Sequence, residues 1–310
     1  MSRWILAAVI FFVSSPAFAQ GEPGGHWGFI DRSGKWTIPP RFDSVRSFTA
    51  GLAAVKVGAL WGYVDHSGKV VVEPRFEEAW SFGDGLAPVK VGGRWGYIDR
   101  WGTTVIEPRF DDAGGFGEGL ARIKQGKVWG YIDKSGATII SPAYDFAGSF
   151  GDGLARAEAG GKAGYIDHTG AWAVAAAFED VRGFSEGLAA VKSGGRWGWI
   201  ARHGPTKLAF RFEGAGSFSE GVASALEGDL WGFVDRNGKW VLKPKWRACA
   251  DFSGGLAAAK AGDAWGFIDR TGAFVIRPVF ADANDFSEGL AAVMTRNERR
   301  TPTVPVQDAR

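Results

Sequence analysis

The sequence predicts an all-β protein in which eight similar units of three antiparallel strands form an array. First, a Trp-Gly pair followed by an aromatic residue, an aliphatic residue and Asp recurs eight times, with isolated replacements, at intervals of 34 residues. A fixed period of this kind is the signature of a repeat architecture. Second, each unit contains several glycines and usually a proline, which excludes a helical solenoid of the same period. Third, the apolar residues alternate in short runs, as they do in strands.

The Trp-Gly pair sets the phase of every unit, and one unit carries Ala163 in place of the tryptophan. We treat the residues of this pair as structural. They are Trp27, Gly28, Trp61, Gly62, Trp95, Gly96, Trp129, Gly130, Gly164, Trp197, Gly198, Trp231, Gly232, Trp265 and Gly266.

One unit illustrates the predicted strands, which run over residues 61–65, 69–73 or slightly beyond, and 86–91. The turn from Asp65 to Gly68 joins the first two strands. Its glycine recurs in all eight units and fits a left-handed turn position. The aspartate fits a side chain that bonds the backbone of its own turn. A calcium loop is excluded because oxygen ligands at alternate positions are missing.

Alternation along the first strand predicts one bulky and one nearly flat face. Trp61 and Tyr63 point one way, whereas Gly62 and Val64 point the other way. We expect the bulky face of one unit to stack on the flat face of the next and form the core. The alternative is that the aromatic side chains are a platform on which sugars or bases stack.

The pattern Trp-Gly-aromatic-Ile/Val-Asp-x-x-Gly, followed by Pro-x-Phe and Gly-Leu-Ala-x-Val-Lys, resembles the bacterial WG-containing repeat family. The resemblance covers about residues 27–295 and implies an all-β repeat fold. It implies no settled biochemical activity and carries over no catalytic residue. The sequence departs from the pattern at Ala163, at Ala201 in place of Asp, and in the Pro-x-Phe region at 173–176 and Phe210.

The two ends of the array favour a propeller-like closed ring over an open β-solenoid. The first unit begins with its Trp-Gly strand and lacks the strand that precedes it elsewhere, whereas residues 290–295 form such a strand with no successor. In a ring, this last strand would pair with residues 27–31. Eight units also lie within the usual range of propellers. A unit of 34 residues is short for a four-stranded blade, so an open β-solenoid of stacked hairpins is the alternative.

The chain divides into a predicted signal peptide at 1–19, a short lead at 20–26, the repeats at 27–295 and a disordered tail at 296–310. Arg3, the apolar run 5–13 and the motif at 17–19 are typical of a secretory signal. We therefore expect an exported protein, periplasmic or secreted, with no transmembrane segment in the mature chain.

Composition excludes several classes of function. The net charge of +2 with interspersed signs gives no reason to expect nucleic acid. The single cysteine, Cys249, stands where other units have Val or Ala, so an inert buried thiol is expected. None of the four histidines has metal-ligand spacing. We expect no metal, no cofactor and no catalytic residue.

Charged residues recur at two positions of the unit, one basic and one acidic. We expect the basic residues and the acidic residues each to form a row, either as a solvated rim or as an electrostatic docking surface for an envelope partner. The residue after the turn Asp is basic: Arg32, His66, Arg100, Lys134, His168, Arg202, Arg236 and Arg270. The residue before the Gly of Gly-Leu-Ala is acidic in six units: Asp84, Glu118, Asp152, Glu186, Glu220 and Glu288.

The repeat degenerates between residues 157 and 211, and we expect function to concentrate there. Ala163 should leave a recess between neighbouring units, with Glu158 and Lys162 as ligand-binding groups at its edge. Neutral drift in one tolerated unit is the alternative.

The function that the sequence favours is a non-catalytic binding or scaffold protein of the cell envelope, whose partner is an envelope protein or a glycan. A propeller-type hydrolase with its site in the degenerate region is one alternative, and a purely structural spacer is another. Catalysis needs particular acids and bases at one place, whereas these repeats multiply each polar residue in phase.

The signal peptide can be tested by intact-mass spectrometry of the exported protein. We expect Gln20 to be the mature N-terminus, because the small residues Ala17 and Ala19 precede it. Exported protein that retains residues 1–19 would contradict this expectation.

Overall fold

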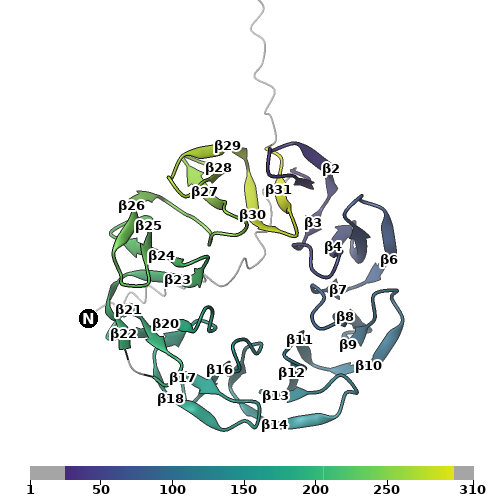
Figure 1. The fold of residues 1–310 in the computed structure, drawn as a ribbon. Coiled ribbons are helices and arrows are strands. Elements are labelled where there is room, and N and C mark those ends of the chain that lie inside the picture. The colour runs from purple at the N-terminus through teal and green to yellow at the C-terminus, as the bar shows by residue number, and fades with distance from the viewer. Residues whose placement is uncertain (1–24, 205, 297–310) are drawn as a thin grey trace, which may run out of the picture.

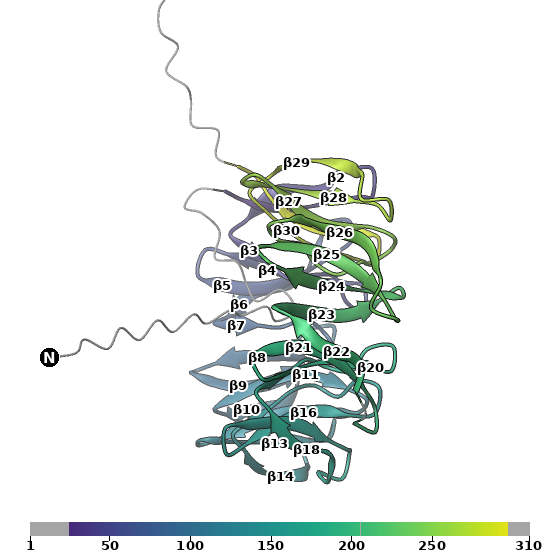
Figure 2. The ribbon, with the colours of Figure 1, turned by 90° about the vertical axis from the view of Figure 1, so that its left-hand side faces the viewer.

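The computed structural model describes residues 25–204 and 206–296, in which eight small antiparallel sheets form a closed ring (Figures 1 and 2). The predicted signal peptide and nearly all of the predicted tail lie outside the described residues. Each sheet is one blade of a β-propeller, with its first strand near the axis and its last strand at the periphery. No helix among the described residues is long and apolar enough to cross a membrane.

The strands of each blade follow, from the axis outward, with the blades in chain order. They are β3 (Ser44–Val45), β4 (Leu52–Val57), β5 (Leu60–Asp65) and β6 (Val70–Phe76); β7 (Glu78–Ala79), β8 (Ala87–Val91), β9 (Arg94–Ile98) and β10 (Thr104–Phe110); β11 (Asp112–Gly117), β12 (Leu120–Gln125), β13 (Val128–Ile132) and β14 (Thr138–Tyr144); β15 (Phe146–Ala147), β16 (Ala155–Ala159), β17 (Lys162–Ile166) and β18 (Trp172–Phe178); β19 (Asp180–Val181), β20 (Leu188–Ser193), β21 (Arg196–Ala201) and β22 (Thr206–Phe212); β23 (Gly214–Ser219), β24 (Val222–Glu227), β25 (Leu230–Asp235) and β26 (Trp240–Trp246); β27 (Ala257–Ala261), β28 (Ala264–Ile268) and β29 (Phe274–Phe280); and β30 (Asp282–Ser287), β31 (Leu290–Met294), β1 (Trp27–Ile30) and β2 (Trp36–Phe42).

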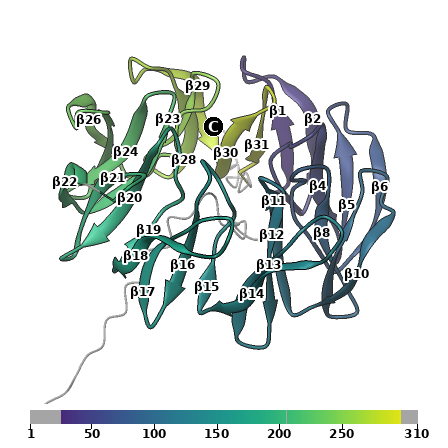
Figure 3. The same cartoon turned by 60° about the horizontal axis from the view of Figure 1, so that its bottom comes forward.

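The two ends of the array share the last blade, which closes the ring (Figure 3). Strand β1 pairs with β31 in antiparallel register from Trp27 opposite Met294 to Ile30 opposite Ala291. The predicted ring is confirmed, and the open solenoid is excluded.

Each unit contains more strand than the sequence predicts. Seven of the eight described sheets have a fourth strand at the axis, formed by the connection after the Pro-x-Phe segment, with two residues in β3, β7, β15 and β19 and six in β11, β23 and β30. The sheet of β27, β28 and β29 has three strands, and a single bridge between Cys249 and Ala259 marks the place of the fourth. These inner strands lie in the part of each unit for which the sequence predicts no strand.

The predicted turn chemistry is confirmed. One carboxylate oxygen of Asp65, Oδ1, accepts the amide of Ser67 at 2.9 Å, its hydroxyl at 2.6 Å and the amide of Lys69 at 3.1 Å. Gly68 has φ +83°, which an L side chain rarely adopts. The bond from the Ser67 hydroxyl and the two amide bonds lower the pKa of Asp65.

The glycine of the Trp-Gly pair is required by its own blade. Trp61 lies opposite Phe76 and Tyr63 opposite Val72, so three residues of β6 bulge over one residue of β5. A Cβ on Gly62 would lie 2.5 Å from the carbonyl oxygen of Val72, which is too close for any side chain. The bulge of the same blade therefore requires glycine here. The predicted stacking of a bulky face on the flat face of the next unit is confirmed, since Val64 lies in one cluster with Trp27 and Phe29 of the preceding unit.

The bulky face does pack against the next blade. Trp61 and Tyr63 form one cluster with Ala87, Val89 and Ile98 of the following blade, and their exposed fractions are 3% and 0%. Eight clusters of this kind run around the ring. The aromatic set at these two positions is core.

The aromatic residue two positions after the tryptophan also forms a hydrogen bond between blades. The Tyr63 hydroxyl donates to the carbonyl of Trp80 at 2.9 Å, so its burial leaves no polar group unpaired. Equivalent bonds run from Tyr97 and Tyr131 to the carbonyls of Gly114 and Gly148.

We expect Trp129→Ala to lower the free energy of unfolding by roughly 3–5 kcal/mol, because it removes a large side chain from the blade interface. Trp129 is 7% exposed. The control is Trp101→Ala, which truncates an indole that is 73% exposed and should change stability by less than about 0.5 kcal/mol. Denaturant unfolding measures both. Equal effects would contradict the assignment of Trp129 to the core.

Candidate functional site

The recurrent acidic residues connect each blade to the next on one face of the ring. All six stand at positive φ, between 48° and 53°, at the tip of a hairpin. The carboxylate of Asp84 accepts the amide of Gly119, 35 residues later, at 2.7 Å. The equivalent pairs are Glu118–Gly153, Asp152–Gly187, Glu186–Gly221, Glu220–Gly255 and Glu288–Gly51.

In four blades the same carboxylate also meets a recurrent basic residue, which lies 50 residues further along the ring. Glu186 bonds Arg236 at 3.1 Å, and Glu220 bonds Arg270 at 2.8 Å. The pairs Glu118–His168 and Glu288–His66 complete the set, at 3.2 and 3.1 Å. The expectation of two separate rows is therefore wrong, because the acid at the tip of one blade reaches the turn of the next.

Two other recurrent polar side chains also form hydrogen bonds within the ring. The carboxylate of Glu77 accepts the amide of Gly93 in the hairpin between β8 and β9. On the periphery, Arg75 donates to the carbonyl of Gly102 in the following blade at 2.6 Å. Arg41, Arg109 and Arg211 make equivalent bonds. The sequence analysis did not single out either position, although both recur in phase.

The degenerate region brings the predicted site residues together. Glu158 and Ala163 are directly opposite each other on β16 and β17, and Lys162 is exposed at the start of β17. The Glu158 carboxylate accepts a bond from Arg156 at 2.8 Å. Ala163 is 1% exposed within the blade interface. A recess at this position stays a prediction.

This region also loses its peripheral bond to the next blade. Where Arg75 reaches the following turn, the unit of β18 has Ala177 and Phe178, which have no side-chain donor for Gly204. The preceding unit lacks the arginine as well, but its Tyr144 hydroxyl donates to Gly170 at 2.6 Å instead. The degenerate unit is therefore held to its successor by fewer polar contacts at the periphery.

A second departure from the repeat lies near the axis. Asp251 and Asp285 stand at equivalent positions, where other units have serine or glycine. Asp251 accepts the Ser224 hydroxyl at 3.0 Å. One oxygen of Asp285, Oδ1, is buried and has no hydrogen-bond partner among the described residues. Sequence reasoning missed this pair, although its signal was present as two acids out of phase with the repeat.

Burial raises the pKa of Asp251 to about 6 and that of Asp285 to about 7, and the Asp251 carboxylate adds to the second shift. Cys249 lies close to both, and burial raises the pKa of its thiol well above the usual value. This supports the expected inert thiol. Among the described residues, no group of three or more His, Cys, Asp or Glu side chains could hold a metal ion.

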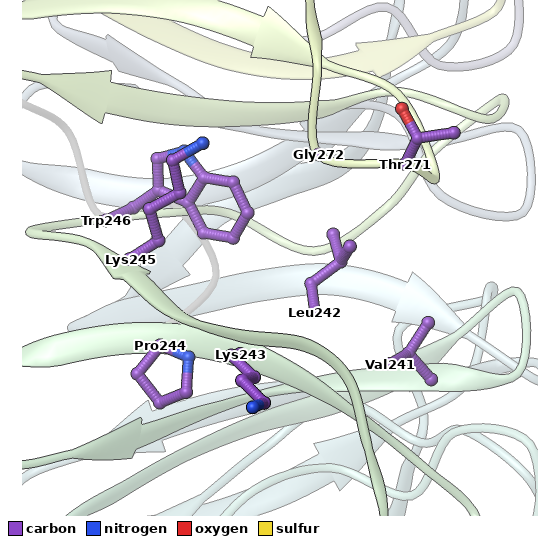
Figure 4. A pocket seen from close by; sticks show the side chains of 8 residues that line it. All are labelled: Val241, Leu242, Lys243, Pro244, Lys245, Trp246, Thr271 and Gly272. Carbon is purple, nitrogen blue, oxygen red and sulfur yellow. The ribbon is translucent and has the colours of Figure 1, made fainter.

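A shallow recess of about 320 Å³ lies at the periphery between β26 and the turn before β29 (Figure 4). Leu242 and Trp246 line it from β26, and Thr271 and Gly272 line it from the turn across from them. Lys245 stands where four other blades have the bridging arginine, and its ammonium lies 5.7 Å from the Trp246 ring. The recess therefore coincides with another interface where arginine does not bridge to the turn.

The family model of the WG containing repeat matches eight consecutive stretches, 27–61, 61–95, 95–129, 129–162, 164–197, 197–231, 231–263 and 265–298. The chain belongs to this family. The resemblance inferred from the Trp-Gly pattern is confirmed, and the WG repeats account for all eight blades. The comparison with curated proteins gives no match.

Solved structures that resemble the ring share its fold and little of its sequence. The dihydro-heme d1 dehydrogenase NirN has a TM-score of 0.55 and 13% identity, over 83% of this chain and 73% of that chain. The C-terminal WD40 domain of Sif2 has a TM-score of 0.51 and 9% identity, over 82% and 96%. Hsv2p of Kluyveromyces lactis also has 0.51 and 9%, over 73% and 92%. These likenesses show the β-propeller fold alone.

The raised pKa of Asp285 predicts a pH-dependent stability. The folded protein keeps this proton up to about pH 7, whereas the unfolded chain releases it near the ordinary aspartate pKa of 3.8, so stability falls as the pH rises between these values. We expect Asp285→Asn to stabilise the protein by on the order of 2 kcal/mol at pH 8 and to have no effect at pH 3.5. Urea unfolding at both pH values measures this. The exposed Asp229→Asn is the control, and an equal gain for both variants would contradict the burial argument.

Proposed function

We propose that this WG-repeat propeller is a non-catalytic binding or scaffold protein that is exported to the periplasm or secreted. Its partner is a protein or a glycan of the cell envelope. The leader-like segment at 1–19 supports export. The ring itself supports a rigid platform, because its ends are paired and its blades are joined at the periphery and on one face.

The proposal rests on the observation that the recurrent polar side chains form hydrogen bonds within the ring. The turn aspartates, the hairpin acids, the tyrosine hydroxyls and the peripheral arginines bond to the ring itself. A ligand therefore meets the side chains that break the repeat. Each such departure occurs in one blade and therefore marks one place on a regular scaffold where a partner can bind, as on the binding surfaces of repeat proteins.

The degenerate blade is one of these contact points. Glu158 is 33% exposed at its side chain and Lys162 is exposed, so both can reach a partner. The missing indole at Ala163 and the missing donor at Ala177 weaken contacts within the ring at the same blade. We propose that Glu158 and Lys162 contact the ligand beside Ala163.

A glycan array and a pull-down from envelope extracts test the proposal with the mature protein. The matched variant is Ala163→Trp with Glu158→Lys, which restores the residues of the other blades. We expect the parent to capture a ligand and the variant to bind it at least about tenfold more weakly while remaining folded.

A more stable variant that binds equally well would remove the degenerate blade from the proposal. Turnover of a captured glycan by the parent would favour the hydrolase. A parent that captures nothing in either screen would favour the structural spacer.

A further inference from the structure

Two blades lack the hairpin acid that the other six provide. Ala50 and Gly254 stand in its place. Ala50 keeps the left-handed backbone of the acids, with φ 52°, so the hairpin has the same shape without its carboxylate. By the 34-residue repeat, the groups that this carboxylate would meet are the amide of Gly85 and the side chain of Arg100.

We propose that Gly85, Arg100 and Trp101 form a binding site for a carboxylate-bearing sugar of an acidic glycan. The inference rests on the proposed binding function and names a second contact point with its class of ligand. The carboxylate of the ligand would occupy the place that the protein's own acids occupy in six blades.

The protein itself shows that these donors bind a carboxylate. In the blade of Glu220, the acid accepts the amide of Gly255 at 3.0 Å and the guanidinium of Arg270 at 2.8 Å. Glu186 does the same with Gly221 and Arg236. An amide and a guanidinium that converge on one carboxylate make charge-assisted bonds, which are stronger than neutral ones. The blade that follows Ala50 presents the equivalent two donors, Gly85 and Arg100, both exposed, and Ala50 supplies no carboxylate to them.

Trp101 supplies a second feature that no other unit has. Its position is occupied by Ser, Thr, Asn or His in the other turns, and these serines and threonines bond the turn aspartate. Trp101 is 73% exposed, and the Arg100 guanidinium lies 5.8 Å from its ring. An exposed indole next to a cation offers a flat apolar surface beside an anion-binding group.

These two features favour an acidic sugar over an acidic peptide. A pyranose ring presents a flat face of C–H groups that can stack on the indole, while its carboxylate reaches the adjacent donors. The carboxylate of an aspartate or glutamate side chain carries no such ring next to it. The charge of Arg100 also favours an anion over a neutral sugar, because none of the ion pairs among the described residues includes Arg100.

The second blade without the acid provides an internal comparison. Arg32 lies over Gly254, where a Cβ would be 2.6 Å from its Nη2 atom, so its guanidinium fills the space of the missing side chain. Its turn carries Ser33, whose hydroxyl bonds Asp31 at 2.6 Å, and offers no indole. We therefore assign the glycan site to the blade of Arg100 alone.

Binding of oligogalacturonate, measured by isothermal titration calorimetry at low salt, tests the assignment. Two variants restore the residues of other blades and should fold: Ala50→Glu, which supplies the internal carboxylate, and Trp101→Ser, which supplies the turn hydroxyl. We expect each to weaken binding at least about tenfold, with an unchanged or higher melting temperature. The control Arg32→Ala should leave binding unchanged.

Two further probes identify the recognised chemistry. Methyl-esterified oligogalacturonate should bind at least about tenfold more weakly, because it has lost the charge. An oligoglutamate peptide should bind more weakly than the acidic sugar, because it lacks the stacking ring. Tighter binding of the peptide would overturn the sugar assignment in favour of an acidic protein.

The proposal fails if the parent does not bind oligogalacturonate, or if Ala50→Glu or Trp101→Ser binds it as tightly as the parent does. Such a failure is distinct from failure of the proposed function. In that case the envelope screens would still yield a ligand that is lost on changing Ala163 and Glu158. An absence of any ligand in those screens would contradict the broader function.

Discussion

The structure depends on one packing interaction that is repeated around a closed ring. The aromatic face of each blade buries itself against the aliphatic face of the next, and β1 with β31 makes the last interface equivalent to the others. Because the rotations between blades must sum to one full turn, each unit has to contribute a blade of equivalent geometry. The constant 34-residue period supplies such equivalent blades. It also explains why bulges, turns and bridging bonds recur with so little variation.

This constraint separates residues that maintain the ring from residues that are free to differ. Gly62 must remain glycine because a neighbouring carbonyl occupies the place of its Cβ. Asp84 joins two blades through its carboxylate, as do the acids of five other blades. Near the axis, the arginine that fills the space between the two inner strands can come from either strand. Arg46 follows β3 in one blade, whereas in another blade Arg122 comes from β12 and faces Gly114. Variation of this kind makes a symmetric scaffold asymmetric, which a specific ligand requires.

The sequence could predict the repeat, the turns and the ring closure, because each leaves a periodic trace in the side chains. It could not predict the inner strand, since two residues such as Glu78 and Ala79 show no alternation. The reason for Gly62 was hidden because a contact between backbones leaves no side-chain signal. Contacts 35 and 50 residues apart were missed because they become neighbours only through the rotation between blades. For the site, Glu158 and Ala163 were predicted from broken periodicity, and Trp101 and Asp285 carried the same signal unnoticed.

Ring closure is the central claim, and native-state hydrogen exchange followed by mass spectrometry tests it most directly. If β1 and β31 are paired from Trp27 to Ile30, their amides should exchange as slowly as those of the interior strands β9 and β13, and only by global unfolding. Fast exchange of β1 and β31 together with full protection of β9 and β13 would show frayed ends. That result would contradict the closed ring and the equivalence of its eight interfaces.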